Sequence, residues 1–312
     1  LWDPLRFDSS EPVQRLLSNS GIFKVLHAGS EDLEVLLHAL DIMPEPFCDT
    51  QIACAMLGQP LQLSYQGAVK WLFDIEIEKD HTRSNWCKRP LRPGQLRYAA
   101  MDVVLLPQML EALKPRLEQA GRWTWLEEEA ARMRETAADP VDPALAYLRI
   151  GGAIRMDDES LRALRALARW REETAQALNR ARGFVISDAG LLELARLRPL
   201  TPSDIHVVGN IHPRALKRYQ PDLLQAIATA AGDRSAIYRP GPLDNRQRHA
   251  LNEMRRVVKA RATELDVDPA LLASRRELER LLRAVAAGNP PPERFLGWRK
   301  QVITDELLAV IG

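Results

Sequence analysis

The chain has 312 residues, more than one compact domain usually holds, so two or three domains are expected. Hydrophobic residues make up 46% and charged residues 27% of the chain, a balance typical of globular proteins that excludes a disordered or membrane-embedded chain. The 43 Lys and Arg residues nearly balance the 42 Asp and Glu residues, which excludes a uniformly basic protein but allows a basic face on one domain and an acidic site on another.

No segment approaches the ~18 uninterrupted apolar residues that span a bilayer, and the first residues do not resemble a signal peptide. The three cysteines, Cys48, Cys54 and Cys87, include no CxxC pair. Such cysteines are typical of reduced thiols in the cytosol. We therefore expect a cytoplasmic protein without a membrane span.

The first part of the chain, residues 1–135, alternates strand-like and helical segments, which predicts an α/β domain. The apolar segment 21–28 is predicted to form a strand, followed by a turn at Gly29 and Ser30. Leucines at helical spacing then predict a helix from Glu31 to about Leu40. Asp32 is therefore expected at a strand-to-helix junction.

Two further segments of this domain carry polar residues near predicted helices. A second strand-to-helix junction is predicted at residues 47–50, before a helix over about 51–57. Pro93 and Gly94 are predicted to open a longer helix over residues 95–113. Tyr98 and Asp102 are four residues apart in this segment and are expected to project from one face.

The rest of the chain is predicted to be helical. Residues 136–158 contain Asp-Pro and Gly-Gly pairs typical of an interdomain linker. Helical patterns follow over residues 159–232 and 240–312, separated by the break Tyr238-Arg239-Pro240-Gly241-Pro242. Residues 185–192 and 267–272 echo each other, each after a long helix with arginines, which predicts two copies of one small helical domain.

Asp32, Tyr98 and Asp102 are the candidates for chemistry. Two carboxylates near sheet ends could coordinate Mg²⁺, which prefers oxygen ligands, and a tyrosine one turn away could hold or deprotonate a water. On spacing alone, capping and surface roles are the commoner use of such residues. Capping is likewise the ordinary role for Asp49, and packing the ordinary role for His27.

Two short motifs resemble those of ribonuclease D, a member of the tyrosine subclass of DEDD exonucleases. Residues 27–36, His-Ala-Gly-Ser-Glu-Asp-Leu-Glu-Val-Leu, resemble its second exonuclease motif, and residues 98–103, Tyr-Ala-Ala-Met-Asp-Val, resemble its third. Asp49-Thr50-Gln51, Trp86 and Arg89-Pro90-Leu91 match in order between them. Residues 164–171 and 271–276 resemble two helicase-and-RNase-D C-terminal (HRDC) domains.

The resemblance implies a fold and an activity. The fold would be an α/β, ribonuclease-H-like 3′-5′ exonuclease core followed by two all-α HRDC domains. Asp32 and Asp102 would bind two Mg²⁺ or Mn²⁺ ions, and Tyr98 would be the catalytic tyrosine. Hydrolysis would release nucleoside 5′-monophosphates from RNA 3′ ends, with precursor transfer RNA as the substrate and a monomer as the active form.

One part of the family pattern is missing. The first exonuclease motif supplies an Asp and a Glu as D-x-E, and no such pair precedes Asp32. The earlier Asp3 and Asp8 do not fit the motif. We therefore expect that an N-terminal segment with the first strands is missing, and that residues 1–312 bind metal poorly and cleave little or nothing.

Arginines on the two helical domains are candidates for contact with the RNA backbone. They are Arg165, Arg169 and Arg171 in the first domain and Arg275 and Arg276 in the second. Such contacts would make binding sensitive to salt and largely independent of sequence. Two alternatives stay open: a non-catalytic nucleic-acid-binding protein, and a DEDD exonuclease that acts on DNA.

Overall fold

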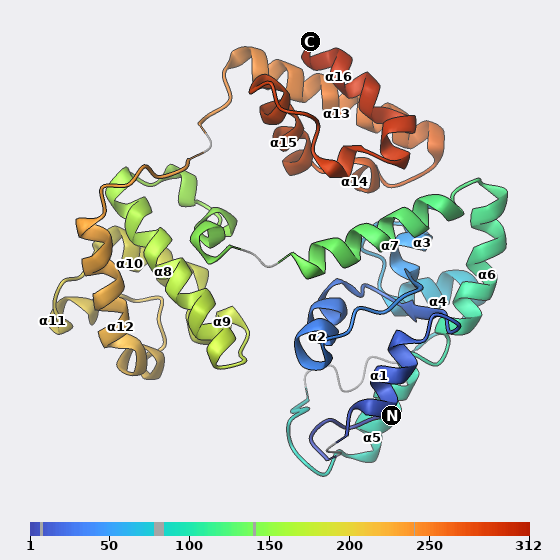
Figure 1. The fold of residues 1–312 in the computed structure, drawn as a ribbon, viewed down its shortest axis with the longest axis horizontal. Coiled ribbons are helices and arrows are strands. Elements are labelled where there is room, and N and C mark those ends of the chain that lie inside the picture. The colour runs from blue at the N-terminus through green and yellow to red at the C-terminus, as the bar shows by residue number, and fades with distance from the viewer. Residues whose placement is uncertain (7–8, 78–83, 140–141, 240) are drawn as a thin grey trace. The chain divides into compact units, whose positions relative to one another are not determined.

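The computed structural model describes residues 1–6, 9–77, 84–139, 142–239 and 241–312, which form two compact units (Figure 1). Unit 1 consists of Leu1–Asp139 together with Leu243–Gly312, and unit 2 of Pro140–Pro242. Unit 2 is therefore inserted between the two segments of unit 1. Of the helices in the described ranges, none is both long and apolar enough to cross a membrane.

The first segment of unit 1 contains two short strands and seven α-helices in its described residues. These are α1 (Glu11–Ser18), β1 (Lys24–Leu26), α2 (Ser30–Leu40), β2 (Phe47–Asp49), α3 (Thr50–Ala55), α4 (Tyr65–Phe73), α5 (Pro93–Met101), α6 (Leu106–Gln119) and α7 (Trp123–Ala138). Strands β1 and β2 pair in parallel, with Leu26 opposite Asp49. Both strands therefore end at the same edge, where α2 and α3 begin.

The helix predicted over residues 95–113 is two helices in the structure. Helix α5 ends with Asp102 as its C-cap, and α6 begins at Leu106 with Pro107 in its first turn. A proline lacks the N–H that a continuous helix needs and its ring crowds the preceding turn, so the chain breaks here. The apolar spacing alone predicts one helix, because it takes no account of this proline.

The second segment of unit 1 packs on the first. It contains α13 (Asn245–Leu265), α14 (Pro269–Leu272), α15 (Arg275–Ala286), a 3₁₀ turn (Glu293–Phe295), a π turn (Lys300–Thr304) and α16 (Asp305–Ile311). One continuous apolar core includes Met109 and Leu113 of α6 together with Met254 of α13 and Leu281 of α15. The second segment of unit 1 therefore shares its core with the first.

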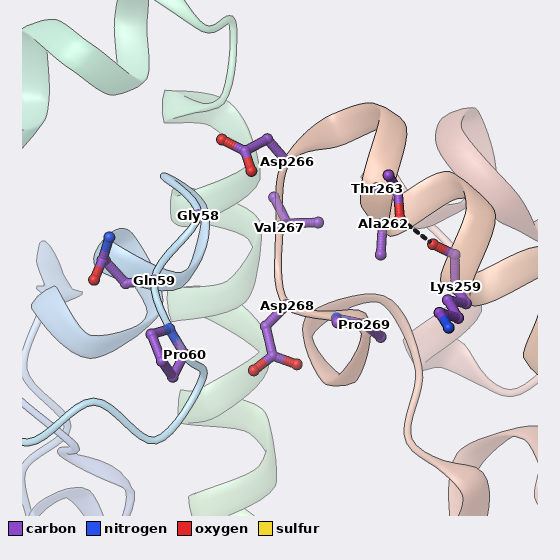
Figure 2. Close-up of a pocket in the computed structure, with 10 residues that line it drawn as sticks. All are labelled: Gly58, Gln59, Pro60, Lys259, Ala262, Thr263, Asp266, Val267, Asp268 and Pro269. Atoms are coloured by element: carbon purple, nitrogen blue, oxygen red, sulfur yellow. Dashed lines mark hydrogen bonds between the residues drawn. The ribbon is translucent and has the colours of Figure 1, made fainter.

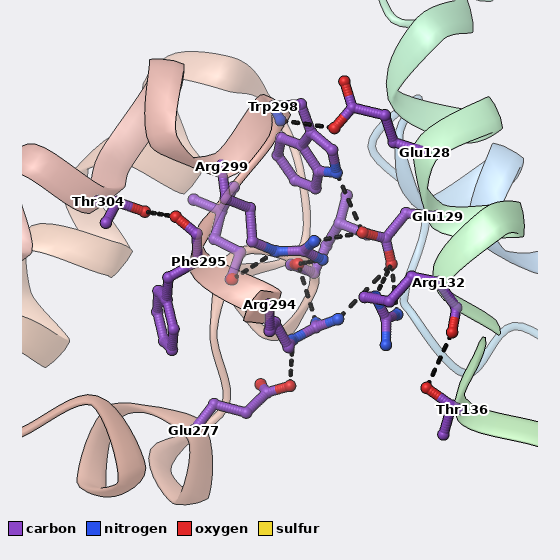
Figure 3. A network of polar contacts seen from close by, with 12 residues as sticks. Glu128, Glu129, Arg132, Thr136, Glu277, Arg294, Phe295, Trp298, Arg299 and Thr304 are labelled. Atoms are coloured by element: carbon purple, nitrogen blue, oxygen red, sulfur yellow. Dashed lines mark hydrogen bonds and ion pairs between the residues drawn. The ribbon is translucent and has the colours of Figure 1, made fainter. Parts of the chain in front are cut away.

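A buried ion-pair network joins α7 to the C-terminal segment (Figure 3). Glu129 of α7, only 2% exposed, accepts hydrogen bonds from the Arg299 guanidinium, from Arg132 at 2.5 Å and from the Trp298 indole N–H at 3.0 Å. The Trp298 ring stacks on Trp125 of α7, with centroids 4.6 Å apart. Burial alone would raise the pKa of Glu129, but the guanidinium of Arg299, and then that of Arg132, lower it to about 2.

Unit 2 has its own helical core. It contains 3₁₀ helices Pro143–Arg149 and Ala153–Arg155, then α8 (Asp158–Ala177), α9 (Arg182–Val185), α10 (Asp188–Leu197), α11 (Pro202–Ile205) and α12 (Pro213–Gly232). Leu164 and Leu167 of α8, Leu194 of α10 and Leu223 of α12 are buried together in this core.

Within the segment expected to be a linker, residues 136–158, the described residues from 142 onward form two 3₁₀ helices and pack in unit 2. Tyr147, Ile150 and Met156 are buried in the unit 2 core, and the Tyr147 hydroxyl donates a hydrogen bond of 2.6 Å to the carbonyl of Tyr238. Prolines and glycines shape the turns here, while the apolar residues between them pack against α8. The described residues 142–158 therefore belong to unit 2.

Candidate active site

Asp32 lies in the first turn of α2, directly after the tight β1–α2 turn formed by residues 27–29. Ala28 has a φ of +58°, in the left-handed region that side chains disfavour. A Cβ at Gly29 would lie 2.8 Å from the side chain of Leu26, so only glycine fits at this close approach. The turn brings Asp32 to the protein surface, where a substrate can reach it.

Two residues from the second junction hold this turn. The Asp49 carboxylate caps α3 by accepting a hydrogen bond of 2.8 Å from the Gln51 N–H, which confirms its expected capping role. It also accepts hydrogen bonds from the N–H groups of Ala28 and Gly29. The imidazole of His27 lies 2.9 Å from the Thr50 hydroxyl and 3.0 Å from the carbonyl of Leu63, so both of its nitrogens have partners within the fold.

Tyr98 and Asp102 are brought together by the end of α5. The Tyr98 hydroxyl hydrogen-bonds the Asp102 carboxylate, and the Asp102 N–H donates to the Tyr98 carbonyl at 3.0 Å. The Trp86 ring lies 6.0 Å from the Tyr98 ring, centroid to centroid. Both residues of the pair are partly exposed to solvent.

Tyr65 of α4 connects the two halves of the site and was not identified from the sequence. Its hydroxyl accepts a hydrogen bond of 3.2 Å from the N–H of Leu105, just after Asp102. Its ring makes an edge contact with His27, just before the β1–α2 turn, with centroids 5.8 Å apart. Its position after the α4 N-cap Ser64 resembles an ordinary core position, so no sequence signal marked it.

The electrostatics of both aspartates favour a cation. Loss of hydration raises the pKa of Asp32, and the charges of Asp49 and Glu31 raise it further. Loss of hydration also raises the pKa of Asp102, with the hydrogen bond from Tyr98 acting in the opposite direction. No Lys or Arg among the described residues contributes to either shift. A bound cation would therefore relieve unfavourable charge at both positions.

The carboxylate oxygens of the site are the kind of ligand that a hard divalent metal prefers, but the site has too few of them to hold a metal by itself. Asp32 and Asp102 offer carboxylate oxygens, which Mg²⁺ prefers and supplements with water and substrate phosphate. Within the described ranges, no group of three or more His, Cys, Asp or Glu residues could hold a metal. Asp3 forms an ion pair with Arg89, with hydrogen bonds of 2.6 and 2.7 Å, and Asp8 lies outside the described residues.

The arginines proposed for RNA contact in unit 2 differ in their surroundings. Arg171 is 4% exposed and pairs with Asp188 at 2.6 Å, and Arg165 pairs with Asp233 at 2.5 Å. Both arginines therefore pair with acidic residues of unit 2, and their contact with RNA stays a prediction. Arg169 is exposed and, among the residues that the structure describes, forms an ion pair only with Glu173, one helical turn away.

In the C-terminal segment the two candidate arginines are exposed at the start of α15. Arg275 pairs with Glu279 one turn along the helix at 3.0 Å. Arg276, beside it, is exposed. Exposed i,i+4 pairs contribute little to stability, so these side chains can exchange partners for a phosphate.

An exposed aromatic residue in unit 2 was missed by the sequence analysis. Phe184 of α9 is 80% exposed and borders a cavity of about 480 Å³ lined also by Asn179, Arg180 and Ala181. An exposed phenyl ring beside an exposed guanidinium suits stacking against a nucleic acid base.

A second cavity lies within unit 1 (Figure 2). It measures about 410 Å³, and Asp32, Tyr98 and Asp102 do not line it. Its residues are Gly58, Gln59, Pro60, Lys259, Ala262, Thr263, Asp266, Val267, Asp268 and Pro269. Asp268 accepts hydrogen bonds from the N–H groups of Leu61 and Ala270, so this carboxylate serves the packing between the two segments.

Comparisons with protein families divide the chain into three matched parts. The 3′-5′ exonuclease model matches residues 1–118, the HRDC domain model residues 160–227, and the model for the C-terminal HRDC domain of ribonuclease D residues 246–307.

Individual relatives match over nearly the whole chain. Ribonuclease D of Pseudomonas paraeruginosa is 36% identical over 313 residues, covering 99% of this chain and 83% of the relative. Ribonuclease D of Granulibacter bethesdensis is 35% identical, covering 96% and 76%. The crystal structure of Escherichia coli RNase D, an exoribonuclease involved in structured RNA processing, matches with a TM-score of 0.83 and 28% identity over 99% of this chain and 84% of that one.

Proposed function

Because the chain belongs to the ribonuclease D family and is a 3′-5′ exoribonuclease, we propose that Asp32, Tyr98 and Asp102 form its catalytic group. The resemblance of the two short motifs to ribonuclease D, and the predicted exonuclease core with HRDC domains, are confirmed by these matches.

The hydrogen bond between Tyr98 and Asp102 carries the proposal. When the phenol O–H donates a hydrogen bond to the carboxylate, the phenol oxygen can still accept a hydrogen bond from a water. Tyr98 would thereby orient the attacking water toward the terminal phosphodiester.

Divalent metal ions are general cofactors of this exonuclease family. For this chain the proposal names two Mg²⁺ or Mn²⁺ ions, with Asp32 and Asp102 as carboxylate ligands. Bound metal would stabilise charge on the scissile phosphate and make water a better nucleophile.

The reaction is a hydrolysis of the last phosphodiester of an RNA chain. The water oxygen forms a bond to phosphorus, the bond from phosphorus to the 3′ oxygen of the preceding nucleotide breaks, and that oxygen takes up a proton. The products are a nucleoside 5′-monophosphate and an RNA one residue shorter with a new 3′ hydroxyl. Asp32 and Asp102 would hold the metal ions, and Tyr98 would direct the water.

The proposed substrate is the 3′ end of a transfer RNA precursor, the proposed location is the cytoplasm, and the proposed active form is a monomer. Basic side chains away from the site would hold the RNA backbone through contacts that weaken with salt. The exposed Arg169, Arg275 and Arg276 suit this role, with Arg180 and Phe184 as an additional contact in unit 2.

The missing D-x-E pair gives a further element of the proposal. With Asp32 and Asp102 as the metal ligands among residues 1–312, these residues by themselves should bind Mn²⁺ weakly and cleave slowly. Cleavage at the rate of relatives that contain the pair would contradict this. Equal cleavage of a matched DNA would favour the DNA-directed alternative, and RNA binding without any cleavage the non-catalytic one.

The central experiment follows release of 5′-monophosphates from an end-labelled RNA with a 3′ hydroxyl, with Mg²⁺ or Mn²⁺ in excess. Tyr98→Phe should lower the rate about 10²–10⁴-fold, because water positioning is lost while the fold keeps its ring packing. Asp102→Asn should lower it at least as much. Internal cuts, release from the 5′ end, or a Tyr98→Phe rate equal to that of the unsubstituted chain would contradict the proposed group.

A further inference from the structure

The Asp49-Thr50-Gln51 motif has no part in the proposed chemistry, yet its first residue is one of the few buried charged groups of unit 1. The Asp49 side chain is only 2% exposed. One carboxylate oxygen accepts hydrogen bonds from the N–H groups of Gln51 at 2.8 Å and Ala28 at 3.1 Å. The other accepts from the N–H of Gly29 at 2.8 Å. A helix cap requires only the first of these three contacts.

Thr50 makes further hydrogen bonds to the residues at the start of the same turn. Its hydroxyl donates a hydrogen bond of 3.0 Å to the carbonyl of Leu26, the last residue of β1, and lies 2.9 Å from Nδ1 of His27. The residues that end β2 therefore bind four consecutive residues, 26–29, of the neighbouring junction. The parallel register that places Leu26 opposite Asp49 makes this possible.

Residues 27–29 could not maintain this turn through their own contacts. Ala28 has a positive φ, and Gly29, the N-cap of α2, has no side chain with which to cap the helix. The N–H groups of both residues depend on Asp49. The α2 helix starts at Gly29 through the hydrogen bond from the Leu33 N–H to the Gly29 carbonyl, at 3.0 Å, so the direction of its first turn follows the turn before it.

We infer that Asp49 is a positioning residue that fixes the β1–α2 turn and thereby aims the Asp32 carboxylate at the metal. The inference rests on the proposed function of Asp32. Partners of this kind, which orient a ligand without touching the metal, typically change metal affinity or activity 10–100-fold when replaced.

The test compares Asp49→Asn with Asp244→Asn. Asp244 caps α13 in the same unit, where it accepts a hydrogen bond of 2.7 Å from the N–H of Gln247, so both changes weaken one helix cap. Asparagine has one acceptor oxygen and a donor NH₂ in place of the second, so Asp49→Asn also loses a partner for the turn. Mn²⁺ binding by electron paramagnetic resonance, RNA cleavage, and amide hydrogen exchange are measured for each.

The expected result is local to the turn. Asp49→Asn should weaken Mn²⁺ binding and lower kcat about 10–100-fold with little change in KM, and should speed exchange at Ala28 and Gly29. Asp244→Asn should leave all three unchanged. In the Asp32→Asn background, Asp49→Asn should cause no further loss of Mn²⁺ binding or activity, because its effect acts through Asp32.

Several outcomes would overturn the inference: normal exchange at Ala28 and Gly29 in Asp49→Asn, equal effects of Asp49→Asn and Asp244→Asn, or a full additional loss in the double variant. If Asp49→Asn fails to fold, Thr50→Val removes the hydroxyl contacts to the same turn and should give a smaller loss of the same kind. If Asp32→Asn binds Mn²⁺ as well as the unsubstituted chain does, Asp32 is not a metal ligand and is not aimed at a metal. The exchange rates would then show separately whether Asp49 holds the turn.

Discussion

Asp32 lies where its own charge is unfavourable for the fold. Loss of hydration, and then the charges of Asp49 and Glu31, raise its pKa above the ordinary 3.8. The folded state therefore binds the Asp32 proton more tightly than the unfolded state does. The free energy of unfolding falls as the pH rises from the pKa of Asp32 in the unfolded chain through its higher pKa in the folded chain. At neutral pH, the charge of Asp32 therefore lowers the stability of the folded state.

Asp32→Asn should therefore separate stability from activity. At pH 7 the variant should lose RNA cleavage, yet its Tm should rise by about 1–2 °C because the unfavourable charge is gone. The difference in Tm should vanish below about pH 3, where the unsubstituted side chain is protonated as well. Thermal unfolding monitored by circular dichroism at pH 3 and pH 7 checks this. Glu34→Gln, on an exposed position of the same helix, is the control, and a fall in Tm of Asp32→Asn at pH 7 would contradict the argument.

At the scale of elements, α7 lies between the candidate site and the C-terminal helices. Its Ala130 and Met133 pack with Leu33 of α2 and Phe47 of β2, while Glu129 pairs with Arg299. The Glu129–Arg299 pair is buried on both sides, so loss of one partner leaves an uncompensated charge in the core.

Glu129→Gln should destabilise unit 1 by ~3–5 kcal/mol in urea unfolding. Because the pKa of Glu129 is lowered to about 2, its contribution is present above pH 4.5 and is lost as pH falls toward 2, so the two proteins should converge in acid. Glu253→Gln, which breaks the exposed pair with Arg256, should cost less than ~1 kcal/mol. An equal loss of unfolding free energy for the two variants would show that the buried ion pair contributes no more to stability than the exposed one.

The short helix α9 offers the clearest test of RNA contact in unit 2. Phe184→Ala should weaken binding of a single-stranded RNA by ~1–3 kcal/mol, because a stacked base loses its platform. Val207→Ala, also in unit 2 and with a side chain 74% exposed, is the control and should bind normally. Fluorescence anisotropy at several salt concentrations measures both. An unchanged affinity of the Phe184 variant would remove α9 from the RNA-binding surface.

Local patterns predicted much of the exonuclease domain. The leucine spacing after Glu31 matches α2, and the junction at residues 47–50 matches the end of β2 and the start of α3. The pairing of Tyr98 with Asp102 also followed from their spacing. The break before Pro107 was missed because apolar periodicity alone cannot reveal a lost N–H donor.

Contacts between distant residues could not be predicted in this way. Glu129 and Arg299 are 170 residues apart, and nothing local to either indicates that they meet. Asp49 was expected only to cap its own helix, because its bonds to Ala28 and Gly29 depend on strand register. Residues 136–158 were interpreted as a linker because prolines and glycines mark turns whether or not the apolar residues between them are buried.

At the scale of the whole molecule, each unit has a separate apolar core. Unit 2 comes from one continuous stretch of chain, whereas the core of unit 1 draws on two stretches separated by that insertion. Substitutions in the Glu129 network should therefore affect the unfolding of unit 1 and leave that of unit 2 unchanged.

This interrupted arrangement has a consequence for biosynthesis. A ribosome adds ~5–20 residues per second, so Arg299 follows Glu129 by roughly 10–30 seconds. Unit 2 can fold within that interval, while the apolar faces of α6 and α7 still await the helices that cover them. A nascent chain would thus hold an open nuclease domain beside a finished helical one, and the nuclease domain would close only after residues 243–312 have emerged.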